Sequence, residues 1–398
     1  MKSEFNFTFG QYHSRALIRD DLPTEKELFG ELAAAKGLSR NHPILAVCDT
    51  NTESIARKIL GNGDPEIPLL ILESGEKSKT WASVETILRA ARDAGLGRDG
   101  VFIGIGGGVI GDLTGFAASI YMRGARFCLV STTFLGMADA CLGGKTGIDL
   151  LGIKNLAGTF YPAELVFIPL SALSTLPERE WKSGMAELIK IAILDSDGFL
   201  ELIKKLLVLE QEGRNSSAYR ECLKECISRS IGYKGSIVEA DPTETGSQRP
   251  LLNLGHTFGH ALEGIAGPGS ISHGEAVAWG IARACELGAA LGVTPLDRAR
   301  EITGVLAASG YETRTPHPEF ARAAFTDILL NAMMADKKQV AVSSNQPKNE
   351  AGFQTAKLRF IVPASKSARI ISAADFPSLD NSGGSTLLNN IISGVYLI

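Results

Sequence analysis

The sequence lacks the features that direct a chain to a membrane, a secretory route or a nucleic acid. No run of 18 or more apolar residues occurs among its 398 residues, so no bilayer-spanning helix is predicted. The start, MKSEFNFTFG, has no apolar leader segment. A net charge of −4 and a pI near 6.0 are not those of a basic nucleic-acid-binding protein. We therefore expect a cytoplasmic protein whose partner is neither a membrane nor a nucleic acid.

Cysteine is scarce as well. Six cysteines are scattered along the chain, four of them within apolar runs, which favours reduced thiols over a disulfide framework. Cys222 and Cys226 lie four residues apart, as metal ligands on a helix can. Because no second cysteine pair lies nearby, we interpret them as two thiols on one helix face.

The pattern of apolar residues divides the chain into two parts. Short β-rich runs alternate with helical stretches in the first part, which indicates a parallel α/β sheet; they occupy 44–49, 69–72, 101–105, 127–132 and 165–170. Helical periodicity dominates the second part, over 181–195, 198–211, 218–240, 254–264, 274–292, 297–309 and 319–335. The prediction is an α/β domain over 1–177 and an all-α domain over 178–398. The polar stretch 341–355 predicts a loop, and the tail 374–398 either a docked terminal element or a partner contact.

A glycine-rich loop follows the strand at 101–105 and precedes a helix. Gly106, Gly108 and Gly111 have the GxGxxG spacing of a Rossmann-like dinucleotide site, where glycines let the backbone approach a pyrophosphate. The next strand ends without an acidic residue. Asp49 and Asn51 end an earlier strand instead, which predicts that NAD binds in a variant order. Glu76 and Lys79 lie in a loop after another strand and add polar groups; a solvated turn is the alternative.

Three of the six histidines fall within eighteen residues. His256 and His260 lie four apart on one helix face, and His273 begins the next helix, so a helix hairpin can bring the three imidazoles together. Glu187 lies in an otherwise apolar helix and shares a face with Lys190, which points to a buried site rather than to an exposed ion pair. Histidines and one carboxylate together suit a catalytic zinc ion.

Basic and polar residues flank both predicted sites. The segment between the domains and the segment before the histidine helix carry Asp139, Lys145, Lys154, Asn155, Lys234, Glu244, Arg249 and Asn253. Such cations suit a substrate that has both a phosphate and a carboxylate, although each lysine alone reads as a solvated surface residue.

Long motifs in the same order resemble the dehydroquinate synthase family of sugar phosphate cyclases: GGGVIGDLTGFAASIYMRG, GGKTGI, GMAELIK, LLNLGHTFGHALE and HGEAVAWG. The resemblance covers residues 44–340. It implies an NAD-binding α/β domain, a helical C-terminal domain, an active site in a cleft, and a homodimer.

The resemblance also assigns roles to individual residues. It implies Glu187, His256 and His273 as ligands of Zn²⁺ or Co²⁺, with catalytic roles for His260, Lys145, Asn155, Lys190, Asp139 and Glu244. It implies substrate contacts from Arg123, Lys154, Lys234, Arg249, Asn253 and one of Lys337 or Lys338. The NAD contacts would be Asp49, Asn51, Glu76, Lys79, Gly107, Gly108, Val109, Asp112, Thr132, Thr133, Thr175, Leu176 and Glu180.

The activity that this resemblance implies is that of a lyase of the shikimate pathway, in aromatic amino acid biosynthesis. Such an enzyme converts 3-deoxy-arabino-heptulosonate 7-phosphate into 3-dehydroquinate and phosphate, with NAD regenerated in each turnover. Another cyclase, of the amino-dehydroquinate or valiolone type, is the nearest alternative. A metal-dependent polyol dehydrogenase is less favoured, because a neutral polyol needs no set of lysines and arginines to bind a phosphate. An inactive NAD-binding protein is less favoured, because Glu187, His256, His273 and Lys145 are all present.

Overall fold

The computed structural model describes residues 2–36, 42–61, 67–195, 197–267, 269–315, 317–321, 324–335, 358–365, 367–372 and 383–393. It forms two compact units, each built from two stretches of chain. The first unit comprises Met1–Gly184 and Arg220–Gln248, and the second comprises Met185–Tyr219 and Arg249–Ile398. The chain passes from the first unit to the second between Gly184 and Met185, and residues 220–248 return to the first unit.

A seven-stranded sheet forms the centre of the first unit, in the order β1-β2-β9-β6-β5-β3-β4. All neighbouring strands are parallel except β1 and β2. The strands are β1 (Glu4–Phe9), β2 (Tyr12–Arg19), β3 (Ile44–Asp49), β4 (Leu69–Leu72), β5 (Val101–Gly106), β6 (Arg126–Ser131) and β9 (Leu165–Pro169). Every residue of β3 and β5 is buried, as expected of central parallel strands that are apolar on both faces. The five predicted strands are confirmed, whereas β1 and β2 were missed.

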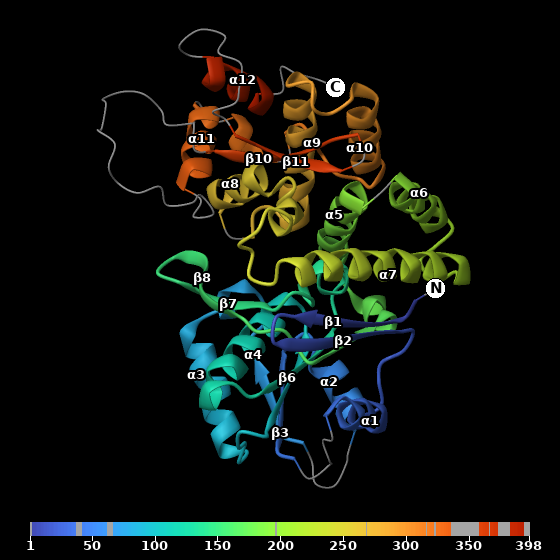
Figure 1. Ribbon diagram of the computed structural model, residues 1–398, viewed down its shortest axis with the longest axis vertical. Helices are drawn as coiled ribbons and strands as arrows, with labels where there is room; N and C mark the ends of the chain where they lie inside the picture. The colour runs from blue at the N-terminus through green and yellow to red at the C-terminus, as the bar shows by residue number, and fades with distance from the viewer. Residues whose placement is uncertain are drawn as a thin grey trace. The chain divides into compact units, whose positions relative to one another are not determined.

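Helices cover both faces of this sheet (Figure 1). They are α1 (Glu25–Lys36), α2 (Glu53–Leu60), α3 (Trp81–Asp93) and α4 (Gly108–Ile120). Helices α1 and α2 share one apolar core with alternate residues of β3, β5 and β6, and α3 and α4 lie on the other side (Figure 1). Helix α7 (Ser217–Ala240) adds to this unit, because Gly232 and Gly235 leave room for the rings of Phe5 and Phe7 on β1.

A separate two-stranded hairpin, β7 (Lys145–Leu150) and β8 (Ile153–Phe160), packs on α4. Its turn has two residues with positive φ, Leu151 at 54° and Gly152 at 75°, as a type I′ turn requires. Sequence reasoning did not predict these strands, although it placed substrate-binding residues on this segment.

The second unit is mainly helical, with α5 (Glu178–Asp195) running into it from the first unit. Its helices are α6 (Asp197–Gln211), α8 (His256–Ala266), α9 (His273–Ala290), α10 (Leu296–Ala308), α11 (Phe325–Ala335) and α12 (Gly383–Ile392). A small antiparallel sheet, β10 (Arg359–Pro363) and β11 (Ala368–Ser372), supplements the predicted helices. The helices expected between residues 181 and 309 are confirmed, whereas the one expected over 319–335 begins only at Phe325, after a 3-10 turn at Pro318–Ala321 and a positive φ of 59° at Ala324.

The C-terminal tail contributes to the core of the second unit. Leu388, Ile391 and Ile392 of α12 are buried in a cluster with residues of α8, α9, α11 and β10. The buried Arg283 of α9 donates a hydrogen bond to the carbonyl oxygen of Ile391 at 3.1 Å. Of the two alternatives for the tail, the docked element is therefore the one observed for residues 383–393. The predicted loop at 341–355 lies outside the described residues.

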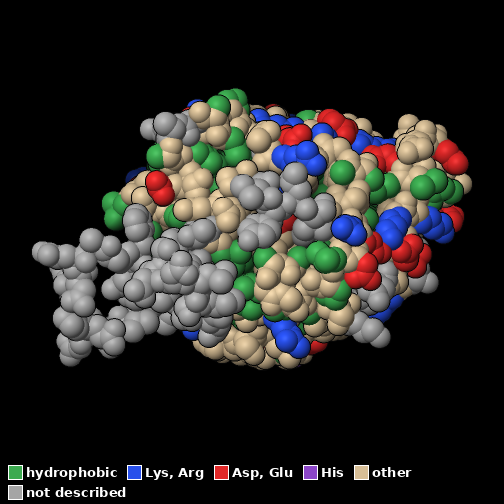
Figure 2. All heavy atoms as spheres, turned by 90° about the horizontal axis from the view of Figure 1, so that it is seen from above, with side chains coloured by type: hydrophobic (Ala, Val, Ile, Leu, Met, Phe, Trp, Pro, Cys, Tyr) green, Lys and Arg blue, Asp and Glu red, His purple; other side chains and the backbone are tan. Residues whose placement is uncertain are grey.

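Two expectations from composition are also met. All six cysteines are buried and free, so none forms a disulfide. Within the described residues, no helix has both the length and the apolar character needed to cross a bilayer. On the face drawn in Figure 2, basic side chains are interspersed with acidic ones, in keeping with the small net charge.

Candidate active site

The loop between β5 and α4 is shaped by close contacts that only glycine permits. A Cβ on Gly107 would lie 2.6 Å from Cγ2 of Thr133, at the end of the neighbouring strand β6. Gly107 precedes α4 and offers no side chain to cap it, so the first amide groups of α4 are available to an anion. The hydroxyl of Thr132 is buried and has no hydrogen-bond partner among the described residues. These features fit the phosphates of a dinucleotide.

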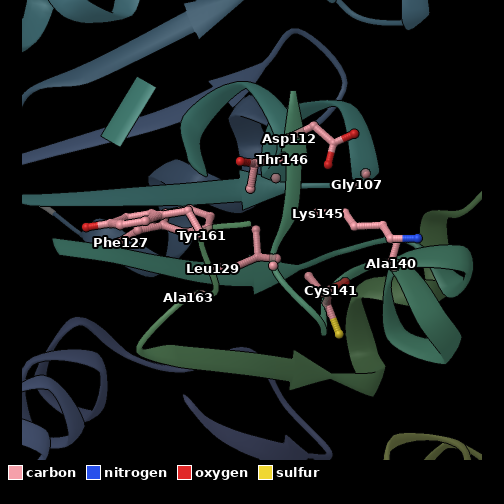
Figure 3. A pocket seen from close by; sticks show the side chains of 15 residues that line it. Gly107, Asp112, Phe127, Leu129, Ala140, Cys141, Lys145, Thr146, Tyr161 and Ala163 are labelled. Atoms are coloured by element: carbon pink, nitrogen blue, oxygen red, sulfur yellow. The ribbon is translucent and has the colours of Figure 1, made fainter. Parts of the chain in front are cut away.

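A pocket with about 370 Å³ of empty space, part of it open to solvent, lies beside this loop. Figure 3 shows that Asp112 enters from α4, Lys145 from β7, and Phe127 and Leu129 from β6. Gly107 and Gly108 line the same pocket. It therefore brings together a predicted phosphate-binding lysine and the predicted cofactor loop.

Asp49 is held rigidly at the carboxyl end of β3. Its Oδ1 accepts hydrogen bonds from the amides of Asn51 at 3.0 Å and Thr52 at 2.9 Å, and from the Thr52 hydroxyl at 2.9 Å. All three bonds reach one carboxylate oxygen. The arrangement fixes an acidic group where the ribose of a dinucleotide is bound in Rossmann-like proteins.

Lys79 is the centre of a polar cluster between the cofactor loop and the hairpin. Its buried ammonium lies 2.6 Å from Asp112 and donates a hydrogen bond to the side chain of Asn155. Burial would lower the pKa of Lys79, but the nearby carboxylates, Asp112 foremost, outweigh it and raise that pKa. Burial in turn raises the pKa of Asp112 to about 6, against the opposing charge of Lys79. Glu76 completes the cluster, 4.0 Å from Lys79 and 3.8 Å from the exposed Lys154.

Two more of the predicted lysines are paired with predicted carboxylates of the same unit. Lys145 lies 2.5 Å from Glu244, which has an unusual positive φ of 58°. Lys234 of α7 lies 2.8 Å from the Asp139 carboxylate and also donates to its backbone carbonyl. Sequence reasoning placed all four residues at the site without pairing them.

Other predicted residues of the first unit are not among those that line this pocket. Arg123 is exposed, follows the C-terminal end of α4, and does not line the pocket that holds Lys145. Thr175 and Glu180 are exposed and Leu176 is half-buried, at the junction of the 3-10 turn Leu170–Thr175 with α5. Val109 is half-buried in the first turn of α4.

In the second unit, Glu187 and Lys190 form a fully buried ion pair on α5. Their side chains are 1% and 2% exposed, and the Lys190 ammonium lies 2.5 Å from Oε2 of Glu187. This burial rules out the alternative of an ordinary exposed pair. Burial would raise the pKa of Glu187, but the Lys190 charge and the hydrogen bond with His273 outweigh it and hold that pKa well below its ordinary value.

Glycines bring α8 and α9 into close contact. A Cβ on Gly280 would lie 2.0 Å from the carbonyl oxygen of Gly255, and one on Gly259 would lie 2.9 Å from that of Ala276. The start of α9 is fixed by a capping box, in which the Ser272 hydroxyl accepts from the Glu275 amide. The approach of the two helices and the fixed start place His273 opposite the histidines of α8.

Glu187, His256 and His273 converge on one point. Their donor atoms all lie within 4.8 Å of one another, and the Nε2 atoms of His273 and His256 lie 2.9 Å and 3.5 Å from Oε1 of Glu187. Nδ1 of His256 lies 3.1 Å from the carbonyl oxygen of Leu254, which favours the tautomer whose Nε2 carries the lone pair. Two imidazoles and a buried carboxylate fit a divalent metal such as zinc.

Electrostatics favour a cation at this point. Burial would lower the pKa of His273, but hydrogen bonds to Glu187 and Glu263 outweigh it and raise that pKa to about 9. A pair of carboxylates that stabilises a proton on this ring also stabilises a metal ion beside it. Sequence reasoning missed Glu263, whose signal was its position on the same face of α8 as His256 and His260.

The remaining predicted residues of the second unit lie near α8. His260 is half-buried, and its ring centroid lies 5.0 Å from that of His256. Arg249 is buried and Asn253 half-buried in the 3-10 turn Arg249–Asn253 that leads into α8. Lys337 and Lys338 lie outside the described residues.

Comparison with known families agrees with the two-part organisation. Residues 69–183 match the family model described as 3-dehydroquinate synthase N-terminal, and residues 184–339 match the one described as 3-dehydroquinate synthase C-terminal. The chain belongs to the 3-dehydroquinate synthase family. Among its relatives, the 3-dehydroquinate synthase of Synechococcus sp. (strain CC9605) is 38% identical over 75% of this chain and 74% of its own length. That of Rhodopirellula baltica is 34% identical over 84% and 82%.

Solved structures share the family's fold. The chain is similar to 2-deoxy-scyllo-inosose synthase in complex with carbaglucose-6-phosphate, NAD⁺ and Co²⁺, with a TM-score of 0.73, 22% identity and coverage of 98% and 99% of the two chains. It is similar to 2-epi-5-epi-valiolone synthase from Streptomyces hygroscopicus subsp. jinggangensis 5008 with NAD⁺ and Zn²⁺, with a TM-score of 0.73, 21% identity and coverage of 96% and 98%. Both resemblances concern the fold, which is that of the sugar phosphate cyclases.

Proposed function

We propose that the protein is a 3-dehydroquinate synthase, a lyase that converts 3-deoxy-arabino-heptulosonate 7-phosphate into 3-dehydroquinate and phosphate in the cytoplasm. The observation that carries the proposal is the buried convergence of Glu187, His256 and His273 in a chain that belongs to this family. A polyol dehydrogenase needs a metal site too, but it has no use for the paired lysines of the first unit.

The cofactors would be NAD and a divalent zinc or cobalt ion. NAD would lie on the loop at Gly107 and Gly108, with Asp49 binding the adenosine ribose and the Thr132 hydroxyl bonding to the cofactor. The metal would be held by Glu187, His256 and His273. When bound, NAD would supply reversible hydride acceptance for the C5 alcohol of the substrate, and the metal would supply a Lewis acid for the hydroxyl of that alcohol.

The chain's own residues would bind the substrate and move its protons. Lys145 lines the pocket with Glu244 beside its ammonium, so a phosphate would replace one anion by another rather than meet an unbalanced charge. Lys154, exposed at the start of β8, would add a second cation. His260, in ring contact with His256, would exchange protons near the metal. Asn155 and Lys190 would orient polar groups of the substrate.

Further contacts are proposed for the substrate and the cofactor. Asp139, Lys234, Arg249, Asn253, Arg123 and one of Lys337 or Lys338 would bind the substrate; Asn51, Glu76, Lys79, Val109, Asp112, Thr133, Thr175, Leu176 and Glu180 would contact NAD. The active form would be a homodimer.

The test is to incubate the purified protein with the heptulosonate phosphate, Zn²⁺ and an amount of NAD well below that of the substrate, and to follow phosphate release. Phosphate in large excess over NAD, without accumulation of NADH, is expected of the cyclase. Stoichiometric NADH would indicate a dehydrogenase. Turnover of another sugar phosphate in place of this one would indicate a cyclase of the valiolone or amino-dehydroquinate type.

A variant tests the metal assignment. His273→Ala is expected to abolish zinc retention and phosphate release while the far-ultraviolet circular dichroism stays that of the parent protein. Full activity in His273→Ala would contradict the assignment of this histidine.

A further inference from the structure

A glutamate of α8 lies beside the proposed metal ligands but outside the group that holds the metal. Glu263 follows His256 by seven residues and His260 by three, so all three lie on one face of the helix. Its side chain is only 16% exposed, and its Oε2 lies 3.3 Å from Nδ1 of His273. His273 is therefore contacted by a carboxylate at each ring nitrogen.

The two nitrogens of His273 face different partners. Nε2 lies 2.9 Å from Glu187, on the side where the proposed ligands converge, and Nδ1 faces Glu263. A neutral imidazole has one lone pair for a metal and keeps its proton on the other nitrogen. With Nε2 bound to a metal, Nδ1 carries the hydrogen and donates it to Glu263. Metal-binding histidines commonly have such a carboxylate partner, which fixes the tautomer and makes the ring a stronger ligand.

We propose that Glu263 is a positioning residue that orients His273 toward the metal and is not itself a ligand. The inference rests on the metal site of the proposed function.

A second group of side chains could also hold a metal, with Glu263 as a ligand: donor atoms of His260, Glu263 and His273 lie within 4.8 Å of one another. The orientation of His256 decides against it. Its Nδ1 is engaged by the Leu254 carbonyl, and its Nε2 and that of His273 both face Oε1 of Glu187. Two imidazoles thus converge on Glu187, whereas in the competing arrangement His256 and the buried Glu187 would be left outside the metal site.

The inference makes a graded prediction for metal affinity. Loss of a carboxylate that supports a metal-binding histidine weakens metal binding by about 10–100-fold, whereas loss of a ligand weakens it further. Glu263→Gln keeps the size and the acceptor oxygen of the side chain and removes its charge. Glu212→Gln is a matched control, since Glu212 is exposed in the same unit. His256→Ala gives the loss expected for a ligand.

The experiment titrates metal-free full-length protein with Zn²⁺ and Co²⁺ in the presence of a competing chelator. For Glu263→Gln the dissociation constant is expected to rise about 10–100-fold, with the visible Co²⁺ bands keeping the intensity of a site with unchanged ligands. The melting temperature of the metal-free protein is expected to fall only slightly, because the contact between Glu263 and His273 is weakened there as well, so metal affinity is the deciding measurement. Glu263→Asp, which keeps the charge, is expected to fall between Glu263→Gln and the parent.

Three results would overturn the inference. A dissociation constant for Glu263→Gln equal to that of Glu212→Gln would show that Glu263 does not act on the metal. A loss as large as in His256→Ala, with altered Co²⁺ bands, would make Glu263 a ligand. A lower melting temperature of the metal-free protein with unchanged metal affinity would show that Glu263 only stabilises the fold. If the parent protein bound neither metal, both the proposed function and this inference would fail. If the parent protein bound metal and Glu263→Gln bound it equally well, only this inference would fail.

Discussion

Replacing Glu187 by glutamine would leave the buried ammonium of Lys190 without its counter-charge. The two charged atoms are 2.5 Å apart, and both side chains are at most 2% exposed. At an effective dielectric constant of about 20, their attraction is roughly 7 kcal/mol. Since Lys190 can lose its proton in response, the observed loss is expected to be about 3–5 kcal/mol, as for other broken buried pairs.

The companion variants make this a double-mutant cycle. Lys190→Met is expected to cost less than Glu187→Gln, because Glu187 keeps its hydrogen bond with His273. The double variant is expected to recover most of the loss, since neither side chain then carries a buried charge that needs a counter-charge, with a coupling free energy of about 2 kcal/mol or more.

The assay should report on the second unit alone. Trp279 is fully buried there, whereas Trp81 and Trp181 belong to the first unit. Urea unfolding of metal-free protein, followed by tryptophan fluorescence on a background with phenylalanine at 81 and 181, isolates that signal. A loss of unfolding free energy below about 1 kcal/mol for Glu187→Gln would refute the idea that each buried charge depends on the other. Additive losses across the cycle would refute it too.

Three further predictions concern the cofactor loop, pH and the C-terminal helix. Gly107→Ala is expected to weaken NADH binding at least about tenfold in a fluorescence titration, because its Cβ would lie 2.6 Å from Thr133, whereas Gly304→Ala on α10 meets no neighbour and is expected to bind normally. Burial raises the pKa of Glu286 from 4.5 to about 7, so the folded second unit holds a proton that the unfolded chain releases; its stability is expected to fall as pH rises from 4.5 to 7, and a Glu286→Gln variant with the same slope would contradict this. Arg283→Met is expected to speed amide hydrogen exchange in α12, and unchanged exchange would show that the bond at 3.1 Å does not hold that helix.

The sheet was predictable because its central strands are buried on both faces. Runs such as ILAVCD, which forms β3, are apolar up to their last residue and stand out from the amphipathic helices around them. The hairpin β7–β8 gave no such signal. Its segment is rich in glycine and polar residues, and its turn at Leu151 and Gly152 lacks the Asn-Gly or Asp-Gly pair that usually marks a type I′ turn.

The division of the chain was harder to predict than its helices. The periodicity of residues 218–240 predicts α7 correctly, but an apolar stripe does not say which unit it will pack against. The close contacts of Gly232 and Gly235 with Phe5 and Phe7, which tie α7 to the first unit, join positions more than 220 residues apart.

The convergence of Glu187, His256 and His273, the candidate metal ligands, could be predicted because such residues are rare in these surroundings. Glu187 interrupts an apolar helix, and His256 and His273 belong to a cluster in a chain that has only six histidines. Glu263 escaped notice because a glutamate near the end of a helix is common, and its partner lies on another helix. The pairing of Lys145 with Glu244 depends on the fold for the same reason.

The return of α7 to the first unit affects when the nascent chain can complete that unit during translation. A ribosome delivers all seven strands of the sheet once residue 169 has emerged, but α7, which packs against Phe5 and Phe7 on β1, follows only later. At about 5–20 residues per second, that interval lasts several seconds. During it Phe5 and Phe7 lack the contacts that α7 supplies. A fragment cut at residue 177 would remain in that state permanently, whereas one that continues to residue 248 would include the helix that covers them.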